Sequence, residues 1–134
     1  MAEVNSEHDE LLKQLRGVQR IVINTQYGGF SLSQQAELRY LELAGIPYTL
    51  EPQEDRDTQL RLGSKIMING KEFNSRYDIK RNDPALVATV RQLGSEASGD
   101  YATLKVVEVP TDVDWYIEEY DGKEWVAEQH RTWR

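Results

Sequence analysis

The chain of 134 residues carries 16 basic and 23 acidic residues, which gives a formal charge of −7 at pH 7. This length predicts one domain with a core of its own. The acidic balance argues against general binding to duplex nucleic acid, because neutralising phosphates needs a surplus of Lys and Arg. It leaves open a small anion held in a locally basic pocket, and an acidic surface that binds another protein.

Cysteine is absent, which excludes disulfide bonds and thiolate metal ligands and is compatible with a cytosolic protein. The acidic residues 1–10 contain no apolar segment of the kind that a signal peptide needs. No apolar run approaches the ~20 residues that cross a bilayer. We therefore expect a soluble, intracellular protein without a membrane partner.

The first segment has the pattern of a short helix. Ser6 is placed as an N-cap, acidic residues follow it in the first turn, and leucines recur at helical spacing before Gly17. We predict a helix over residues 6–16 that packs on the domain or on a neighbouring subunit. Residues 1–19 are therefore assigned to an N-terminal helical extension, and residues 20–134 to a single α+β domain that binds a nucleotide.

The domain begins with a strand, a loop and a helix. Residues 20–24 are an apolar run that predicts a strand, and apolar side chains at helical spacing predict a helix from Ser33 to about Ala44. A second strand is predicted over residues 46–50. The charged residues 51–64 are predicted to form a loop.

The remainder is richer in strands. The elements predicted there are strands over residues 65–69, 71–73, 104–110, 114–120 and 124–134, hairpin turns at Asn69-Gly70 and Asp121-Gly122, and a helix from Asp83-Pro84 to Gly94. Residues 74–82 and 95–100 are predicted to be loops. This order favours an α+β fold with a small mixed or antiparallel sheet, two to three helices and a C-terminal β-hairpin.

The junction between the first strand and the following helix combines residue types that suit a nucleotide. Glycines allow close backbone approach, a helix N-terminus offers N–H groups, aromatic rings stack on bases, and hydroxyls donate to phosphate. The residues with these properties are Tyr27, Gly28, Gly29, Phe30, Ser31 and Ser33. Their spacing matches neither GxGxxG nor the phosphate loop, so a tight structural turn with core aromatics is the alternative.

Two further groups of cations follow. In the C-terminal stretch 130–134, Arg131 can bind a phosphate with both of its forked N–H groups and Trp133 can stack on a base. The alternative is an edge strand whose arginines pair with acids of the hairpin. Arg76, Lys80 and Arg81 lie just before the Asp83 helix, where solvated surface charge is the alternative interpretation.

Signals for catalysis are poor. The two histidines, His8 and His130, are far apart, and no metal-ligand spacing occurs. Ser33 lacks the GxSxG context of an activated nucleophile. We therefore predict a binding protein rather than an enzyme, with no cofactor and no metal.

Three separated motifs resemble a widespread family of phage proteins. Val22 to Ser33 is similar to the family motif INxCYGGFxLS, Arg81 to Val87 to its RxDPxLV segment, and residues 104–133 to its C-terminal region. The resemblance covers roughly residue 20 to the end, weakly over residues 51–76. One departure is that Gln26 stands where the motif has Cys, which bears on the choice of ligand.

The resemblance implies a viral anti-CBASS sponge. Such a protein binds a cyclic dinucleotide immune signal, such as 3'3'-cGAMP, in the host cytoplasm and sequesters it without cleavage. It also implies a homo-oligomer, expected to be a tetramer, with ligand held between subunits. The ligand-binding candidates are Tyr27, Gly28, Gly29, Phe30, Ser31, Ser33, Arg81, His130, Arg131 and Trp133.

Three alternatives stay open. The acidic hairpin over residues 108–128 favours a protein–protein interaction module that inhibits a host factor. The ligand of a sponge can also be another nucleotide signal, such as cyclic ADP-ribose. A hydrolase of nucleotide signals, dependent on His130 or an added metal, ranks last.

Overall fold

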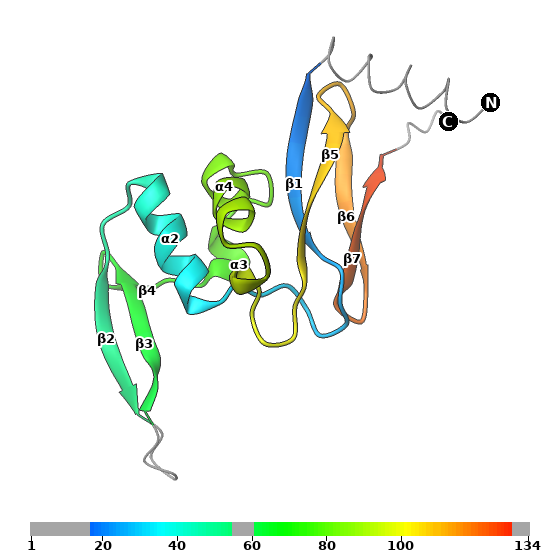
Figure 1. Cartoon of the computed structure of the whole chain (residues 1–134). Coiled ribbons are helices and arrows are strands. Elements are labelled where there is room, and N and C mark those ends of the chain that lie inside the picture. The colour runs from blue at the N-terminus through cyan, green and yellow to red at the C-terminus, as the bar shows by residue number, and fades with distance from the viewer. Residues whose placement is uncertain (1–16, 55–60, 130–134) are drawn as a thin grey trace, which may run out of the picture.

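The computed structural model describes residues 17–54 and 61–129. The elements, labelled in Figure 1, are β1 (Val18–Asn24), α2 (Gln34–Ala44), β2 (Thr49–Glu54), β3 (Arg61–Ile68), β4 (Lys71–Glu72), α3 (Ser75–Asp78), α4 (Pro84–Leu93), the 3-10 helix η1 (Gly94–Ala97), β5 (Leu104–Pro110), β6 (Trp115–Tyr120) and β7 (Lys123–Glu128). The helix predicted over residues 6–16 lies outside the described residues. Within the described part of the chain, no helix is long and apolar enough to cross a bilayer.

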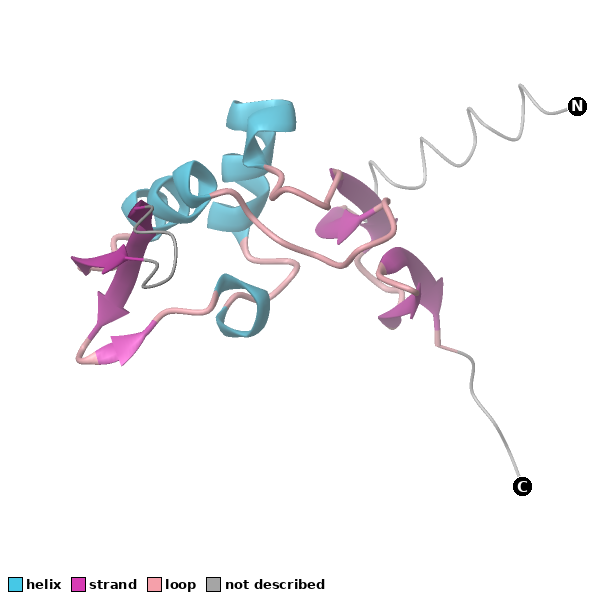
Figure 2. Ribbon diagram, turned by 90° about the horizontal axis from the view of Figure 1, so that it is seen from below, coloured by secondary structure: helices cyan, strands magenta, loops and turns pink. Residues whose placement is uncertain are grey.

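The strands form three small antiparallel sheets, which confirms the predicted α+β class and the C-terminal hairpin. β1 pairs with β5, β2 and β4 flank β3, and β6 pairs with β7. Figure 1 shows the β2–β4 sheet at one end, α2 and α4 in the middle, and the other four strands at the opposite end. Figure 2, seen from below, shows the same succession. The helices therefore separate two groups of strands.

The core lies where α2 and α4 meet β1 and the first residues after it. Its buried members include Val22 of β1, Phe30 of the junction, Leu41 of α2 and Leu86 of α4. Both longer helices begin as the sequence predicts, with Ser33 and Asp83 as N-caps that accept hydrogen bonds from backbone N–H groups. Burial of these apolar faces holds the two helices together.

Both predicted hairpin turns are confirmed. Asn69 and Gly70 have φ values of 52° and 79°, and Asp121 and Gly122 have 51° and 89°. Positive φ at both central positions is the geometry that these residue pairs favour.

The middle of the chain differs from the prediction. Residues 51–64 were expected to form a loop, but β2 extends to Glu54 and β3 begins at Arg61, so an antiparallel pair occupies both ends of that stretch. Pro52 falls where the register shifts between Glu51 and Gln53, a position at which a strand tolerates proline. The charged composition misled the prediction because this ribbon does not need an apolar face along its whole length.

Two smaller boundaries also differ. The strand predicted over residues 46–50 begins only at Thr49, because the N–H of Ile46 donates to the Leu41 carbonyl and closes the end of α2. The predicted loop over residues 74–82 contains the short helix α3. Its N-cap is Asn74, whose side chain accepts from the N–H of Arg76 at 3.1 Å.

Tyr40 joins α2 to the start of α4 and generates a pH prediction. Its hydroxyl donates to Asp83 Oδ2 at 2.8 Å, and its ring stacks on Phe73 with the centroids 6.3 Å apart. Burial first, and then the hydrogen bond to Asp83 and its charge, raise the pKa of Tyr40 from 10.0 to about 12. The folded state therefore keeps this proton after the unfolded state has lost it, so the stabilisation is present below pH 10 and is lost towards pH 12.

We expect Tyr40→Phe to abolish most of the stability loss that the protein shows between pH 10 and about 12, which is roughly 1–2 kcal/mol once solvent screening is included. The same change should cost about 1 kcal/mol at neutral pH. Urea unfolding at a series of alkaline pH values measures the difference. Tyr77→Phe is the control, because Tyr77 is 76% exposed. An unchanged alkaline slope in Tyr40→Phe would contradict this assignment.

Candidate functional site

Three segments that are far apart in the sequence meet at one pocket beside the junction. They are the glycine loop over residues 28–30, the segment 76–81 and the turn region 119–124 of the β6–β7 hairpin. We call this hollow the junction pocket. Its volume is about 560 Å³, and its lining residues are Gly28, Gly29, Phe30, Arg76, Tyr77, Arg81, Glu119, Asp121, Gly122 and Glu124.

Asn24, at the end of β1, fixes the walls of the junction pocket. Its side chain is fully buried. Its Nδ2 donates to the carbonyls of Gln26 at 2.6 Å and Gly122 at 2.8 Å. Its Oδ1 accepts from the backbone N–H groups of Thr103 at 2.9 Å and Gln26 at 3.2 Å. Both ends of the amide are therefore satisfied, and the glycine loop is held against the hairpin turn.

A nearly buried ion pair holds the hairpin from the other side. The two terminal nitrogens of Arg81 donate to the two carboxylate oxygens of Glu124 at 2.7 and 2.8 Å, with side-chain exposures of 18% and 9%. The same guanidinium donates to the Val22 carbonyl and lies 3.6 Å from the centre of the Phe30 ring. Glu124 also accepts from the backbone N–H of Asn24 at 2.8 Å. Arg81 thus lines the junction pocket, but its charge is matched within the protein.

The two glycines of the loop lie directly against the hairpin turn. The N–H of Gly28 donates to the Asp121 carbonyl at 3.1 Å. Gly28 and Gly29 have φ values of 121° and 105°, and a Cβ on Gly122 would lie 2.8 Å from backbone atoms of Gly28. The glycines predicted to allow close approach of a ligand therefore first allow close approach of the protein's own backbone.

The other predicted residues of the junction occupy different environments. Tyr27 is 56% exposed, with Lys123 Nζ 5.7 Å from its ring centre, whereas Phe30 is 2% exposed and belongs to the core. Ser33 Oγ accepts from the N–H of Ala36 and donates to the Glu96 carbonyl. The N–H of Gly99 donates to the Ser31 carbonyl. Neither serine lines the junction pocket, because the N-terminus of α2 packs against the segment that contains η1.

Arg76 is the cation of the junction pocket that the described carboxylates leave unpaired. It is exposed, its Nη2 lies 3.0 Å from the position of a Cβ on Gly29, and no described carboxylate forms a salt bridge with it. Sequence reasoning found Arg76 only as one member of a charged cluster. Lys80, from the same cluster, does not line the pocket. Asn24 and Glu124 were missed, and the only signal for Asn24 was a polar residue at the end of an apolar strand.

The electrostatics of the junction pocket are mixed. Once Arg81 and Glu124 are paired, one guanidinium, on Arg76, remains beside the carboxylates of Glu119 and Asp121. Glu119 Oε2 also accepts from the N–H of Gly122 at 2.8 Å. This combination suits a ligand that has one anionic group together with amino or hydroxyl donors, and it is unfavourable for a bare polyanion.

No group of three metal-ligating side chains occurs in the ranges 17–54 and 61–129. The described chain ends with Gln129, whose N–H donates to the Asp114 carbonyl at 2.8 Å. His130, Arg131 and Trp133 lie outside the described residues, so their part in the site stays a prediction.

Searches against protein-family models, curated proteins and solved structures gave no match to this chain. The resemblance carried by the three sequence motifs therefore stays a prediction.

The ion pair between Arg81 and Glu124 predicts a large effect on stability. We expect Glu124→Ala to lower the free energy of unfolding by about 3 kcal/mol, because it leaves a mostly buried guanidinium without its partner. Glu108→Ala is the matched control, since Arg20 and Glu108 are 3.7 Å apart and almost half exposed. That change should cost less than about 1 kcal/mol. Equal losses in urea unfolding of the two variants would contradict the importance of the buried pair.

The contact between the glycine loop and the Asp121-Gly122 turn leads to a second prediction, and the Asn69-Gly70 turn provides the control. Gly122→Ala and Gly70→Ala introduce the same methyl group at similar φ values, 89° and 79°, in turns of the same type. A Cβ at Gly122 meets the glycine loop, whereas a Cβ at Gly70 meets nothing within 4 Å. We expect Gly122→Ala to be less stable than Gly70→Ala by about 1–3 kcal/mol in thermal or urea unfolding. Similar losses of stability in the two variants would show that the positive φ of the turn, and not the contact with the glycine loop, causes the destabilisation.

Proposed function

We propose that this protein binds a cyclic dinucleotide in the junction pocket and sequesters it without cleaving it. The observation that carries the proposal is the guanidinium of Arg76, which rests over Gly29 in a pocket of about 560 Å³ and has no described carboxylate partner. A phosphodiester is a suitable partner for such a group, because the guanidinium donates two parallel hydrogen bonds.

The remaining lining residues suit the other parts of a nucleotide. The carboxylates of Glu119 and Asp121 accept hydrogen bonds from base amino groups and ribose hydroxyls. Tyr77 lines the pocket and is 76% exposed, so its ring is accessible to a base. Base stacking on such a ring contributes roughly 1–3 kcal/mol. Tyr27, on the same loop as the glycines, is a second exposed ring.

Sequestration suits a pocket of this construction. Asn24 and the Arg81–Glu124 pair hold its walls before any ligand arrives, so binding does not have to order them. A sponge acts by mass action and needs tight affinity and abundance rather than turnover. The motif resemblance supports this role, and the proposal extends to a phage protein that inhibits the CBASS defence in the host cytoplasm.

The proposal includes a homo-oligomer, expected as a tetramer. A cyclic dinucleotide carries two phosphates, whereas the described part of the junction pocket offers one guanidinium that is not already paired. The second cation is then Arg131 of the same chain or a cation of a neighbouring subunit.

A second candidate function is supported by the outer face of the β6–β7 hairpin. Tyr116 and Trp125 both donate to Glu118, at 2.8 Å each, and Tyr120 on the same face is 70% exposed. Exposed aromatic side chains around a carboxylate are typical of protein-binding surfaces. This face supports the alternative of an acidic interaction module that inhibits a host factor.

The test is retention of the intact nucleotide. The full chain is incubated with 3'3'-cGAMP, other cyclic dinucleotides or cyclic ADP-ribose, separated, denatured, and the released compound identified by mass spectrometry. We expect stoichiometric release of an intact cyclic nucleotide. Arg76→Ala should weaken binding by about tenfold or more, because it removes a charged hydrogen-bond donor. Arg39→Ala is the control, since Arg39 pairs with Glu42 on α2 and does not line the pocket.

Each other outcome identifies a different function. Release of a linear product would show that the protein is a hydrolase of the cyclic nucleotide. No retention at micromolar protein would reject the sponge. Loss of a host-factor interaction in Glu118→Lys, with no effect of Arg76→Ala, would support the interaction module.

A further inference from the structure

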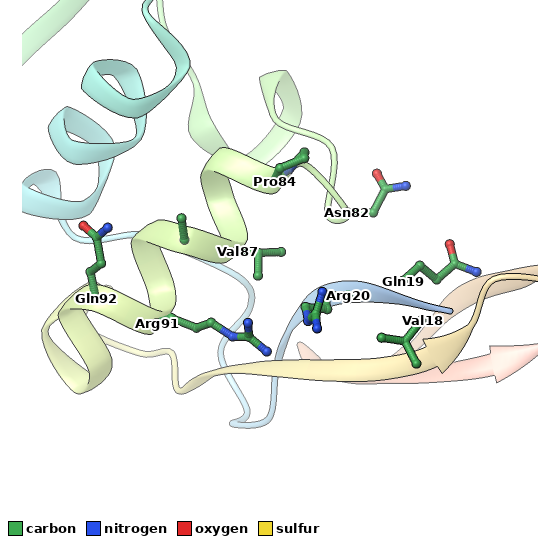
Figure 3. Close-up of a pocket in the computed structure, with 9 residues that line it drawn as sticks. Val18, Gln19, Arg20, Asn82, Pro84, Val87, Arg91 and Gln92 are labelled. Atoms are coloured by element: carbon green, nitrogen blue, oxygen red, sulfur yellow. The ribbon is translucent and has the colours of Figure 1, made fainter. Parts of the chain in front are cut away.

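A second hollow of similar size lies between β1 and α4, and we call it the α4 groove. Its volume is about 580 Å³. Figure 3 shows the side chains around it, with the strand on one side and the helix on the other. It shares no lining residue with the junction pocket, and its properties are independent of the function proposed for that pocket.

The charged side chains that line the α4 groove are both arginines, in a chain whose formal charge is −7. Arg20 comes from β1 and Arg91 from the last turn of α4. In Figure 3 the Arg91 side chain extends from the helix towards Arg20. Arg20 forms an exposed ion pair with Glu108 at 3.7 Å, whereas no described carboxylate forms a salt bridge with Arg91. The groove therefore contains one arginine, Arg91, whose charge no described carboxylate neutralises.

The presence of a cation at position 91 is partly explained by its place in the last turn of α4, because a cation there interacts favourably with the helix dipole. It does not explain the second arginine across the groove. Both arginine side chains are exposed, and the ion pair with Glu108 leaves Arg20 with further N–H donors. An anion in the groove would therefore be attracted by Arg91 and could also accept hydrogen bonds from Arg20.

The remainder of the α4 groove combines the amide side chains of Gln19, Asn82 and Gln92 with an apolar wall. Val18 contributes from the strand, and Pro84, Val87 and Ala88 contribute from the helix. Ligand pockets commonly combine such apolar walls with a few polar groups that orient the ligand. An inorganic ion would leave the apolar walls without a partner, whereas an anion attached to an apolar body would contact both parts.

We propose that the α4 groove is a second binding site, for an organic anion with an apolar body. The acidic group lies between the guanidinium groups of Arg20 and Arg91 and accepts hydrogen bonds from both. The apolar body lies against Val18, Val87 and Ala88. The common chemistry of the ligand is a carboxylate, sulfonate or phosphate attached to a hydrophobic ring or chain.

The probe for this site is anilinonaphthalene sulfonate, and phenylnaphthylamine serves as a neutral analogue with similar rings. Fluorescence titration of the full chain should give saturable binding of the sulfonate that weakens as salt is raised. Arg91→Ala should weaken it by about tenfold, with little effect on the neutral analogue. Amide shifts in NMR spectra should cluster at residues 18–20 and 82–92.

A matched pair of variants distinguishes the effect of charge on ligand binding from steric hindrance in the groove. Ala88→Glu and Ala88→Gln add side chains of nearly equal size to the groove wall, and both residues are good helix formers. We expect Ala88→Glu to weaken sulfonate binding at least tenfold more than Ala88→Gln, because only the former places a carboxylate beside the two arginines. Thermal unfolding verifies that each variant is folded. Equal effects of the two changes, binding unaffected by Arg91→Ala, or amide shifts centred on residues 28–30 and 119–124 would overturn the proposal.

Discussion

The buried contacts between Asn24, Glu124 and Arg81 are the constraint on which this structure depends. The β6–β7 hairpin comes last among the described elements, and a two-stranded ribbon alone is marginally stable. The side chains of Asn24 and Arg81 attach it to β1 and to the start of α4. Because each group is nearly or fully buried, each needs its partners, and the hairpin is fixed in one position.

The same contacts determine what the junction pocket can hold. Arg81 was expected to meet a ligand, but its two forked hydrogen bonds end on Glu124 and its face covers Phe30. In the function proposed for the junction pocket, the anion is therefore assigned to Arg76, which α3 places over the glycine loop. The net charge of the whole chain is a poor guide to these sites, since the junction pocket has both arginines and carboxylates in its lining and the charged residues that line the α4 groove are arginines.

The elements that the sequence predicted are those set by local rules. Ser33 and Asp83 cap helices through their own side chains, and the pairs Asn69-Gly70 and Asp121-Gly122 select hairpin turns. The parts of the β2–β3 ribbon that extend into residues 51–64 were missed, because that stretch is charged and each strand is paired by another segment of the chain. Contacts such as Asn24 to Gly122, 98 positions apart, depend on tertiary approach, which no local pattern encodes. Both pockets are products of such approaches.

The backbone contact between Gly28 and the Asp121-Gly122 turn has a consequence for how this sequence can diverge. Two turns that are separated by most of the domain occupy one shared space, so neither can gain a side chain or a residue independently. Substitutions at one turn are tolerated only after the other has moved. Among homologues, these distant positions should therefore vary together or not at all, as if they were one short segment of chain.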